Sequence, residues 1–237
     1  MTDTPMRSHL LVSADDEKAA ELALASRADC VWLDLENSAS RPKARGLILE
    51  ILKSGRRAPP RLYVRVSPLP SGELDADLDA VMRGAPAAIV LPRSSGGADV
   101  QHLGAKLALR EAEFDLPDAS TKIIALAAQA PASIFKMGTY VGASRRLAGI
   151  CWAPEDLAAS IGASSLREPD GALAEPYRLA RSFTLMAAKA AGIAAIDCAS
   201  DLPSALKSEC EAARRDGFSG KLAREADEIA IINAVFA

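Results

Sequence analysis

The sequence of 237 residues predicts an α/β protein, specifically a closed (β/α)8 barrel of the TIM type. Short, nearly uniformly apolar segments, typical of parallel strands buried on both faces, alternate with amphipathic segments of helical periodicity. Eight such strand–helix pairs fit this length, and no linker or repeat divides the chain, so we expect one domain over residues 1–237. A doubly wound open sheet is the alternative.

Each predicted strand is bounded by a turn signal and is too short to be a core helix. The strands are expected at residues 9–13, 30–34, 61–66, 88–91, 122–126, 147–152, 194–197 and 218–222. Amphipathic patterns predict helices over residues 14–24, 40–52, 75–82 and 99–112. Pro154 suits the first position of a further helix, because its missing N–H costs nothing there. Residues 162–176 read as a long insertion, expected to form a loop at the active face.

Composition excludes several classes of protein. A net charge of −3 argues against nucleic acid, which needs a concentrated basic face. No apolar run reaches the roughly 18 residues that span a bilayer, and the first residues lack the apolar core of a signal peptide, so we expect a cytoplasmic protein without a membrane partner. Four cysteines without C-x-x-C spacing indicate reduced core thiols. The two histidines, His9 and His102, nearly exclude a histidine-rich metal site and are expected to be structural.

In a barrel, the carboxyl ends of the strands meet at one mouth, where enzymes of this fold hold their chemistry. Glu155 and Asp197 each follow a strand and could line this mouth, or each could cap the helix that follows it. Asp34, between two leucines, could be a buried hydrogen-bond anchor, and Arg93 could pair with a neighbouring acid. Arg65, within an apolar strand, needs an anionic partner or a substrate carboxylate. The polar residues at these strand ends are Asp34, Glu36, Arg65, Arg93, Gln129, Glu155, Asp156 and Asp197.

The chain has neither a G-x-G-x-x-G nor a Walker A pattern, and the glycine-rich residues 94–97 are only a weak phosphate signal, more typical of a loop. Two or more carboxylates and an arginine at one mouth would suit a divalent, oxygen-loving cation such as Mg²⁺ that holds an oxyacid substrate.

A set of short motifs follows a fixed order along nearly the whole chain. They are RSHLLVSA (7–14), VWLDLE (31–36), LYVRV (62–66), LDADL (74–78), IVLP (89–92), WAPEDL (152–157), YRLARS (177–182) and GFSGK (217–221). In this order and spacing the chain resembles the HpcH/HpaI aldolase/citrate lyase family, specifically its citrate lyase β-subunit-like members.

The resemblance implies a (β/α)8 barrel and a lyase that makes or breaks a carbon–carbon bond in malyl-, citramalyl- or citryl-type thioesters of coenzyme A, generally with Mg²⁺. It implies that Asp156 is a metal ligand, that Arg65 binds the carboxylate or keto-acid oxygens of the substrate, and that Glu36 belongs to the outer shell around the metal. Because family members are commonly oligomers, we also expect a homo-oligomer.

The sequence departs from the family at several of these positions. The second metal ligand, a glutamate at the end of strand 5, falls on Ala128, with Gln129 in the neighbouring threonine position. Asn37 replaces an aspartate, and Arg93 and Ser95 replace a lysine and a glutamate. Residues 224–226 replace an I-H-P segment, and the chain stops short of the C-terminal extension that many members use as a lid. Mg²⁺ affinity should therefore fall sharply unless Glu155, Glu36 or the substrate compensates.

Two functions remain open on these grounds. One is a citrate lyase β-like carbon–carbon lyase with an altered Mg²⁺ site, acting on a small oxyacid or its acyl-CoA thioester. The other is a catalytically degenerate barrel that serves as a ligand-binding or partner subunit. We expect Arg65, Glu36 and Asp156 to converge on one pocket, lined also by Ala128 and Gln129. If Ala128 alone removes the metal affinity, Ala128→Glu should restore a metal ligand; if that variant binds no Mg²⁺, the degenerate barrel is favoured.

Overall fold

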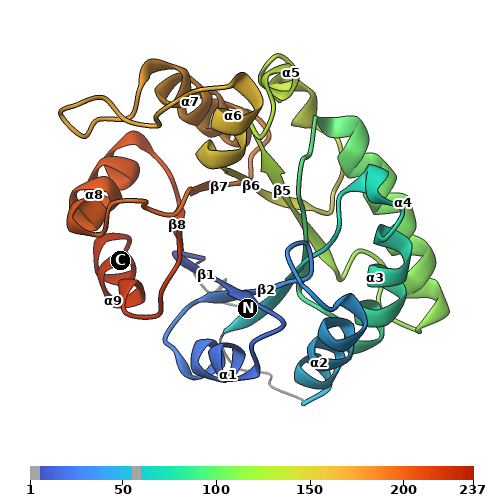
Figure 1. Ribbon diagram of the computed structural model, residues 1–237. Helices are drawn as coiled ribbons and strands as arrows, with labels where there is room; N and C mark the ends of the chain where they lie inside the picture. The colour runs from blue at the N-terminus through green and yellow to red at the C-terminus, as the bar shows by residue number, and fades with distance from the viewer. Residues whose placement is uncertain (1–5, 55–59) are drawn as a thin grey trace.

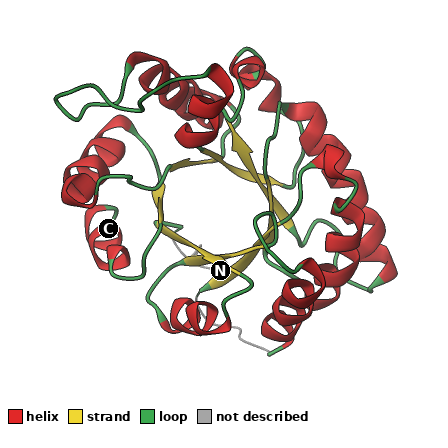
Figure 2. Ribbon diagram, in the orientation of Figure 1, coloured by secondary structure: helices red, strands yellow, loops and turns green. Residues whose placement is uncertain are grey.

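The computed structural model describes residues 6–54 and 60–237 and confirms the (β/α)8 barrel. Within these residues, eight parallel strands pair in sequence order, and β8 pairs with β1, which excludes the open sheet. Helices form a ring around the strands (Figure 1, Figure 2). The strands are β1 (Ser8–Ser13), β2 (Cys30–Asp34), β3 (Arg61–Arg65), β4 (Ala88–Leu91), β5 (Lys122–Ala127), β6 (Leu147–Trp152), β7 (Ala194–Asp197) and β8 (Gly220–Ala223).

Several helices begin where the sequence supplies a side-chain cap or a proline. α1 starts three residues later than expected, because the Asp16 side chain accepts a hydrogen bond from the Ala19 N–H at 2.9 Å and ends the preceding turn. Pro154 opens α6 as predicted. The helices are α1 (Glu17–Ala25), α2 (Arg41–Lys53), α3 (Leu74–Val81), α4 (Gly97–Glu113), α5 (Pro131–Ile134), α6 (Pro154–Ile161), α7 (Glu175–Ala190), α8 (Leu206–Asp216) and α9 (Glu228–Val235), with 3-10 turns η1 (Leu69–Ser71), η2 (Met82–Gly84), η3 (Met137–Tyr140) and η4 (Pro203–Ala205).

The last strand differs most from its predicted limits. β8 starts at Gly220 rather than at residue 218, because Phe218 is buried beneath the guanidinium of Arg181, 4.6 Å from the ring centroid. A Cβ at Gly220 would collide with the carbonyl oxygens of Met6 and Arg7, so the close approach of the segment before β1 requires a glycine at this point. The barrel therefore closes on a strand with little apolar signal of its own.

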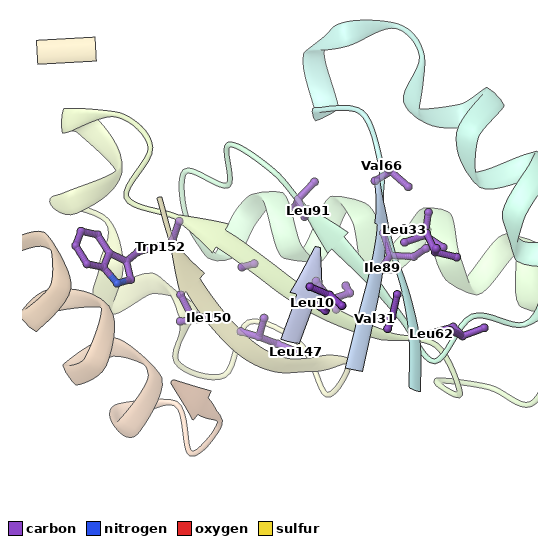
Figure 3. Packing of buried hydrophobic residues seen from close by; sticks show 14 of the residues in the cluster. Leu10, Val31, Leu33, Leu62, Val66, Ile89, Leu91, Leu147, Ile150 and Trp152 are labelled. Atoms are coloured by element: carbon purple, nitrogen blue, oxygen red, sulfur yellow. The ribbon is translucent and has the colours of Figure 1, made fainter. Parts of the chain in front are cut away.

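Apolar residues form two layers, one on each face of the strands. The larger cluster, which includes Leu10, Val31 and Leu62 (Figure 3), joins the outward faces of the strands to the helices. The smaller cluster contains buried residues of the strands alone and fills the lumen, as the period-two alternation of a strand requires. Its members are Cys30, Trp32, Tyr63, Ala88, Val90, Ile124, Leu126, Cys151 and Ile196.

His9 lies in contact with this lumen cluster and has a structural role. Its ring is 5.5 Å from that of Trp32 and 6.1 Å from that of Tyr63, between ring centroids. Trp32 Nε1–H donates to His9 Nδ1 at 3.1 Å, and His9 Nε2 lies 3.2 Å from the Met6 carbonyl oxygen. Burial lowers the pKa of His9 to about 4, so the ring is neutral near pH 7.

The cysteines and the length of the helices were also subjects of expectation from the sequence. All four cysteines are free thiols, as predicted. In the part of the chain that the structure describes, no helix is long and apolar enough to cross a membrane. Residues 1–5, which entered the signal-peptide argument, lie outside the described residues.

Candidate functional site

The ends of β2 and β3 hold a buried ion pair that faces the mouth. Asp34 and Arg65 are paired in register, and each lies two residues beyond a lumen side chain, Trp32 and Tyr63, so strand alternation directs both inward. Arg65 Nε and Nη2 donate to the two carboxylate oxygens of Asp34 at 2.8 and 2.5 Å. Burial opposes the charge on Arg65, but the hydrogen bonds and charge of Asp34 raise its pKa. Asp34 is thus a buried anchor and supplies the anionic partner of Arg65.

Glu36 lies between two guanidinium groups just beyond this pair. Its Oε2 is 3.6 Å from Arg65 Nε, and its Oε1 is 3.5 Å from Arg93 Nε. Burial raises the pKa of Glu36, the two arginines oppose that rise, and the charges of Asp34 and Asp156 add to it. The charge of Asp156 acts on both Glu36 and Arg65, but of these three residues, expected to line one pocket, Asp156 alone lines the cavity described below.

The chain leaves β4 and β5 through two left-handed residues, Arg93 (φ 53°) and Ala128 (φ 56°). Such a conformation costs a non-glycine residue on the order of 1–3 kcal/mol, so neighbouring contacts must maintain it. One such contact joins the two turns, because the Arg93 backbone N–H donates to Gln129 Oε1 at 2.5 Å. The turn at Ala128 leaves its methyl group buried in the outer apolar cluster and places Gln129 at the mouth.

The residue of β5 that meets Asp156 is Gln129. Its Nε2 donates to Asp156 Oδ2 at 2.6 Å, and Asp156 lies in the first turn of α6. Ala128 is fully buried and does not line the adjoining cavity. This corrects the expectation that Ala128 contributes to the pocket: its neighbours Gln129 and Ala130 do so instead.

A cavity of about 210 Å³ opens between the turns after β4 and β5 and the start of α6. Its donors include the Arg93 guanidinium, which is 64 % exposed, and the hydroxyls of Ser94 and Ser95. The Tyr140 hydroxyl holds Ser94 in place, with its oxygen 2.9 Å from the Ser94 Oγ and 3.1 Å from the Ser94 carbonyl oxygen. This chemistry suits a small anion. The lining residues are Arg93, Ser94, Ser95, Gln129, Ala130, Ser133 and Asp156.

The sequence motifs do not indicate Ser94 and Ser95 as binding residues, because they fall in a glycine-rich stretch typical of a loop. Their position directly after an apolar strand was the signal that could have identified them. The neighbouring glycine, Gly97, has a packing role: its N–H donates to Thr139 Oγ1 at 2.9 Å, and a Cβ there would collide with the Thr139 carbonyl oxygen. The loop is therefore packed against η3 rather than shaped as a phosphate cradle.

Glu155, predicted as a possible metal ligand, lies outside this cavity. Its carboxylate is exposed and forms an ion pair with Arg224, in the segment after β8. Arg224 is held in turn by a hydrogen bond from its Nε to the Ser200 carbonyl oxygen at 3.0 Å. The structure therefore separates Glu155 from its sequence neighbour Asp156 by giving each a different partner.

Asp197, expected at the mouth, instead faces the helices. It accepts a hydrogen bond from Trp152 Nε1 at 2.8 Å and lies 3.2 Å from Arg181 Nε and 3.5 Å from Lys221 Nζ. Lys221 Nζ is also 3.5 Å from Glu209 Oε2. We call Asp197, Lys221, Arg181 and Glu209 the lateral ion cluster. The insertion between α6 and α7 contributes to it, because Arg167 contacts Glu209 at 2.7 Å, and that insertion extends outward from the ring (Figure 1).

The carboxylates at the mouth already have partners. Both oxygens of Asp34 are bound by Arg65, Glu36 lies between two arginines, and Asp156 accepts from an amide. Over residues 6–54 and 60–237, no group of three or more histidine, cysteine, aspartate or glutamate side chains is arranged to hold a metal ion.

Known proteins resemble this chain over most of its length. A curated relative from Mycobacterium tuberculosis, a citrate lyase subunit beta-like protein, is 31% identical over 176 residues. That match covers 73% of this chain and 57% of the relative. A (3S)-malyl-CoA thioesterase from Cereibacter sphaeroides is 28% identical over 242 residues, which cover 98% of this chain and 77% of the relative.

Solved structures show the same similarity in three dimensions. The crystal structure of the Mycobacterium tuberculosis protein CitE in complex with magnesium, acetoacetate and coenzyme A superposes with a TM-score of 0.78 at 27% identity, covering 98% of this chain and 81% of CitE. RipC from Yersinia pestis superposes with a TM-score of 0.77 at 27% identity, covering 99% and 97% of the two chains.

The sequence profile of one family spans nearly the whole barrel, from β1 to the segment beyond β8. It matches residues 7–226 and is described as HpcH/HpaI aldolase/citrate lyase. Taken with the fold, the similarity of the relatives and the charged residues at the mouth, this match establishes that the chain belongs to the HpcH/HpaI aldolase/citrate lyase family.

Proposed function

We propose that this protein is a citrate lyase β-subunit-like carbon–carbon lyase that acts on a small oxyacid or on its acyl-CoA thioester. The observation that carries the proposal is the position of Glu36, half-buried between two guanidinium groups, one of which belongs to Arg93 in the lining of the cavity. The family supports the class of reaction, because its relatives include citrate lyase β subunits and malyl-CoA thioesterases.

The cavity suits the carboxylate end of such a substrate. The Arg93 guanidinium can bind a carboxylate through two parallel hydrogen bonds, and the Ser94 and Ser95 hydroxyls can donate to further oxygens. At about 210 Å³ the cavity is smaller than the roughly 300–1,000 Å³ of pockets for drug-sized ligands. A coenzyme A moiety would therefore extend outside it.

The chemistry assigned to the mouth is the cleavage of a β-hydroxy acid or thioester. A base removes the hydroxyl proton, the O–H electron pair becomes the carbonyl π bond, and the carbon–carbon bond breaks. Its electrons form an enolate, which then takes up a proton. We assign the proton transfers to Glu36, because its raised pKa brings it closer to neutral pH. Arg65 and Arg93 would stabilise the negative charge that develops.

One contact favours the second candidate, a barrel that binds ligand without turning it over. The Gln129 amide satisfies Asp156, the residue that the family resemblance makes a metal ligand. In that case oxyacids would bind in the same cavity, but no bond would be cleaved.

Binding and turnover together decide between these candidates. Oxaloacetate, pyruvate, glyoxylate, acetyl-CoA and Mg²⁺ are screened by thermal shift, because a ligand that binds only the folded state raises the melting temperature. Malyl-, citramalyl- and citryl-CoA are then assayed with Mg²⁺ and with a chelator. A lyase releases a keto acid, trapped as a hydrazone, while the thiol stays esterified. A thioesterase releases free thiol.

Glu36→Gln tests the assigned role. We expect kcat to fall about 100-fold or more with little change in KM, because the amide cannot accept the proton. The exposed Glu211→Gln in α8 is the matched control and should leave both parameters unchanged. Ligand-induced stabilisation without turnover of any thioester would establish the ligand-binding barrel. The absence of both ligand binding and turnover would contradict both candidates.

A further inference from the structure

We propose that the Gln129 amide closes the position beside Asp156 where a divalent cation would bind, so that the mouth binds anions without Mg²⁺. Family members are solved with magnesium, as in the CitE complexes, so the donor set of this chain decides whether the ion fits here. The proposal concerns ion binding alone and does not depend on which reaction the mouth performs.

The hydrogen bonds of Gln129 fix the orientation of its amide. A backbone N–H can only donate, so the group that faces the Arg93 N–H at 2.5 Å must be the amide oxygen. The NH₂ end therefore points at Asp156 Oδ2, 2.6 Å away. Because Gln129 is 7 % exposed, the amide is buried against its partners. A cation placed there would meet N–H hydrogens on one side and would have to break the bond to Asp156.

The remaining carboxylates cannot make up the loss. Asp34 gives one oxygen to each of two Arg65 donors, Glu36 faces a guanidinium on each side, and Glu155 is paired with Arg224. Mg²⁺ takes near-octahedral coordination by about six oxygens, usually several waters together with one or two carboxylates. Of the four carboxylates Asp34, Glu36, Glu155 and Asp156, Asp156 alone has no cationic partner, and the Gln129 amide donates to it.

Positive charge is nevertheless present where an anion would enter. The Arg93 guanidinium lines the cavity and is the group best placed to take over charge neutralisation of a carboxylate. The left-handed turns of Arg93 and Ala128 hold this arrangement, because they bring the Arg93 N–H within reach of Gln129. One short contact thus fixes both the anion-binding arginine and the amide that excludes the cation.

Gln129→Glu tests the proposal, because it keeps the shape of the side chain and exchanges the NH₂ for an oxygen. One carboxylate oxygen would still accept from the Arg93 N–H, and the other would face Asp156 and form a two-carboxylate site. Calorimetric titration with MgCl₂ at pH 8, without substrate, should give no saturable binding for the parent. We expect Gln129→Glu to give a saturable titration, with a Kd at least about tenfold below the highest MgCl₂ concentration tested on the parent, and the double variant with Asp156→Asn to lose that binding.

Ala128→Glu is the matched control, since it adds the same carboxylate one residue away. Its side chain would enter the apolar cluster from a left-handed residue, so it should lower the melting temperature and give no Mg²⁺ binding. Circular dichroism verifies that Gln129→Glu is folded. Mg²⁺ binding by the parent equal to that of Gln129→Glu would overturn the proposal. So would a folded Gln129→Glu protein that binds no Mg²⁺, or Mg²⁺ binding restored by Ala128→Glu alone.

Discussion

Two groups of charged residues lie near the carboxyl ends of the strands, and their partners differ. In the lateral ion cluster, buried Lys221 faces two carboxylates, and Asp197 also meets an arginine and an indole N–H. At the mouth, Arg93 is largely exposed beside a cavity, and Glu36 meets its arginines only at 3.5–3.6 Å. The charges of the first group are paired with one another, although all four residues also line a cavity of about 660 Å³, whereas the Arg93 guanidinium of the second group is largely exposed.

The difference arises from the face of the strand on which each residue falls. Asp34 and Arg65 are two residues beyond lumen side chains and therefore point into the barrel. Asp197 directly follows the lumen residue Ile196 and therefore points outward, into the helical layer. A charged residue at a strand end is thus no guide to function until its face is known.

Lys221→Met gives the largest expected effect and tests whether the lateral ion cluster is purely structural. It leaves the buried Asp197 and the half-buried Glu209 without one cation, so we expect the free energy of unfolding to fall by about 3 kcal/mol. Urea denaturation measures this loss. The exposed Lys207→Met in α8 is the control, with less than about 0.5 kcal/mol expected. An unchanged midpoint for Lys221→Met would show that the cluster contributes no stability.

Arg93→Ala at the mouth should reduce ligand affinity and leave stability nearly unchanged, the opposite of what we expect for Lys221→Met. Its side chain is 64 % exposed, so stability should change by less than about 0.5 kcal/mol. Affinity for a small oxyacid such as oxaloacetate should fall about tenfold or more, because a charged hydrogen-bond donor is lost. Calorimetry measures the affinity, and Lys221→Met should retain it. Equal losses of affinity in the two variants would contradict the distinction between the regions.

The pKa of a carboxyl group in each region should also shift in opposite directions, downward for Asp197 and upward for Glu36. Burial would raise the pKa of Asp197, but Lys221, Arg181 and the Trp152 hydrogen bond outweigh it and hold the pKa below the usual aspartate value. The charge of Asp197 therefore stabilises the folded state at pH values above the usual aspartate pKa, and this contribution disappears as the pH falls through the lowered pKa. Glu36 has a raised pKa, so the folded protein retains a proton that the unfolded chain has released. The free energy of unfolding should therefore decline as the pH rises from the usual glutamate pKa to the raised pKa of Glu36 in the folded protein.

Carboxyl carbon shifts in NMR titrations measure both pKa values directly. The urea midpoint of the parent should fall as the pH rises across this range, whereas the midpoint of Glu36→Gln should not show this fall. Titration of both carboxyls at ordinary values would mean that the two regions do not differ electrostatically.

The sequence predicted the barrel well because each element carries its own signal. Uniformly apolar strands such as residues 30–34 and 147–152 have the predicted limits, since burial on both faces leaves a continuous apolar run. β8 was placed two residues early, because its start depends on contact between Gly220 and the segment before β1. Such a long-range contact leaves no local pattern.

The places of the candidate residues follow from the strand pattern, although their roles stay predictions. Arg65 ends β3, Glu36 lies two residues beyond β2, and Asp156 lies in the first turn of α6. The left-handed turn at Ala128 could not be inferred, because alanine rarely adopts that conformation and nothing local predicts it. The family resemblance therefore placed the lost glutamate on Ala128, whereas the side chain that meets Asp156 belongs to Gln129.

The contact between Gln129 and Asp156 has an evolutionary consequence. Glutamine and glutamate codons differ in a single base, and the two side chains have the same length and shape. A point mutation at this codon could therefore open or close the cation position while the neighbouring turns and the barrel stay intact. Within such a lineage, dependence on a metal would be a reversible trait, gained and lost faster than the fold around it diverges.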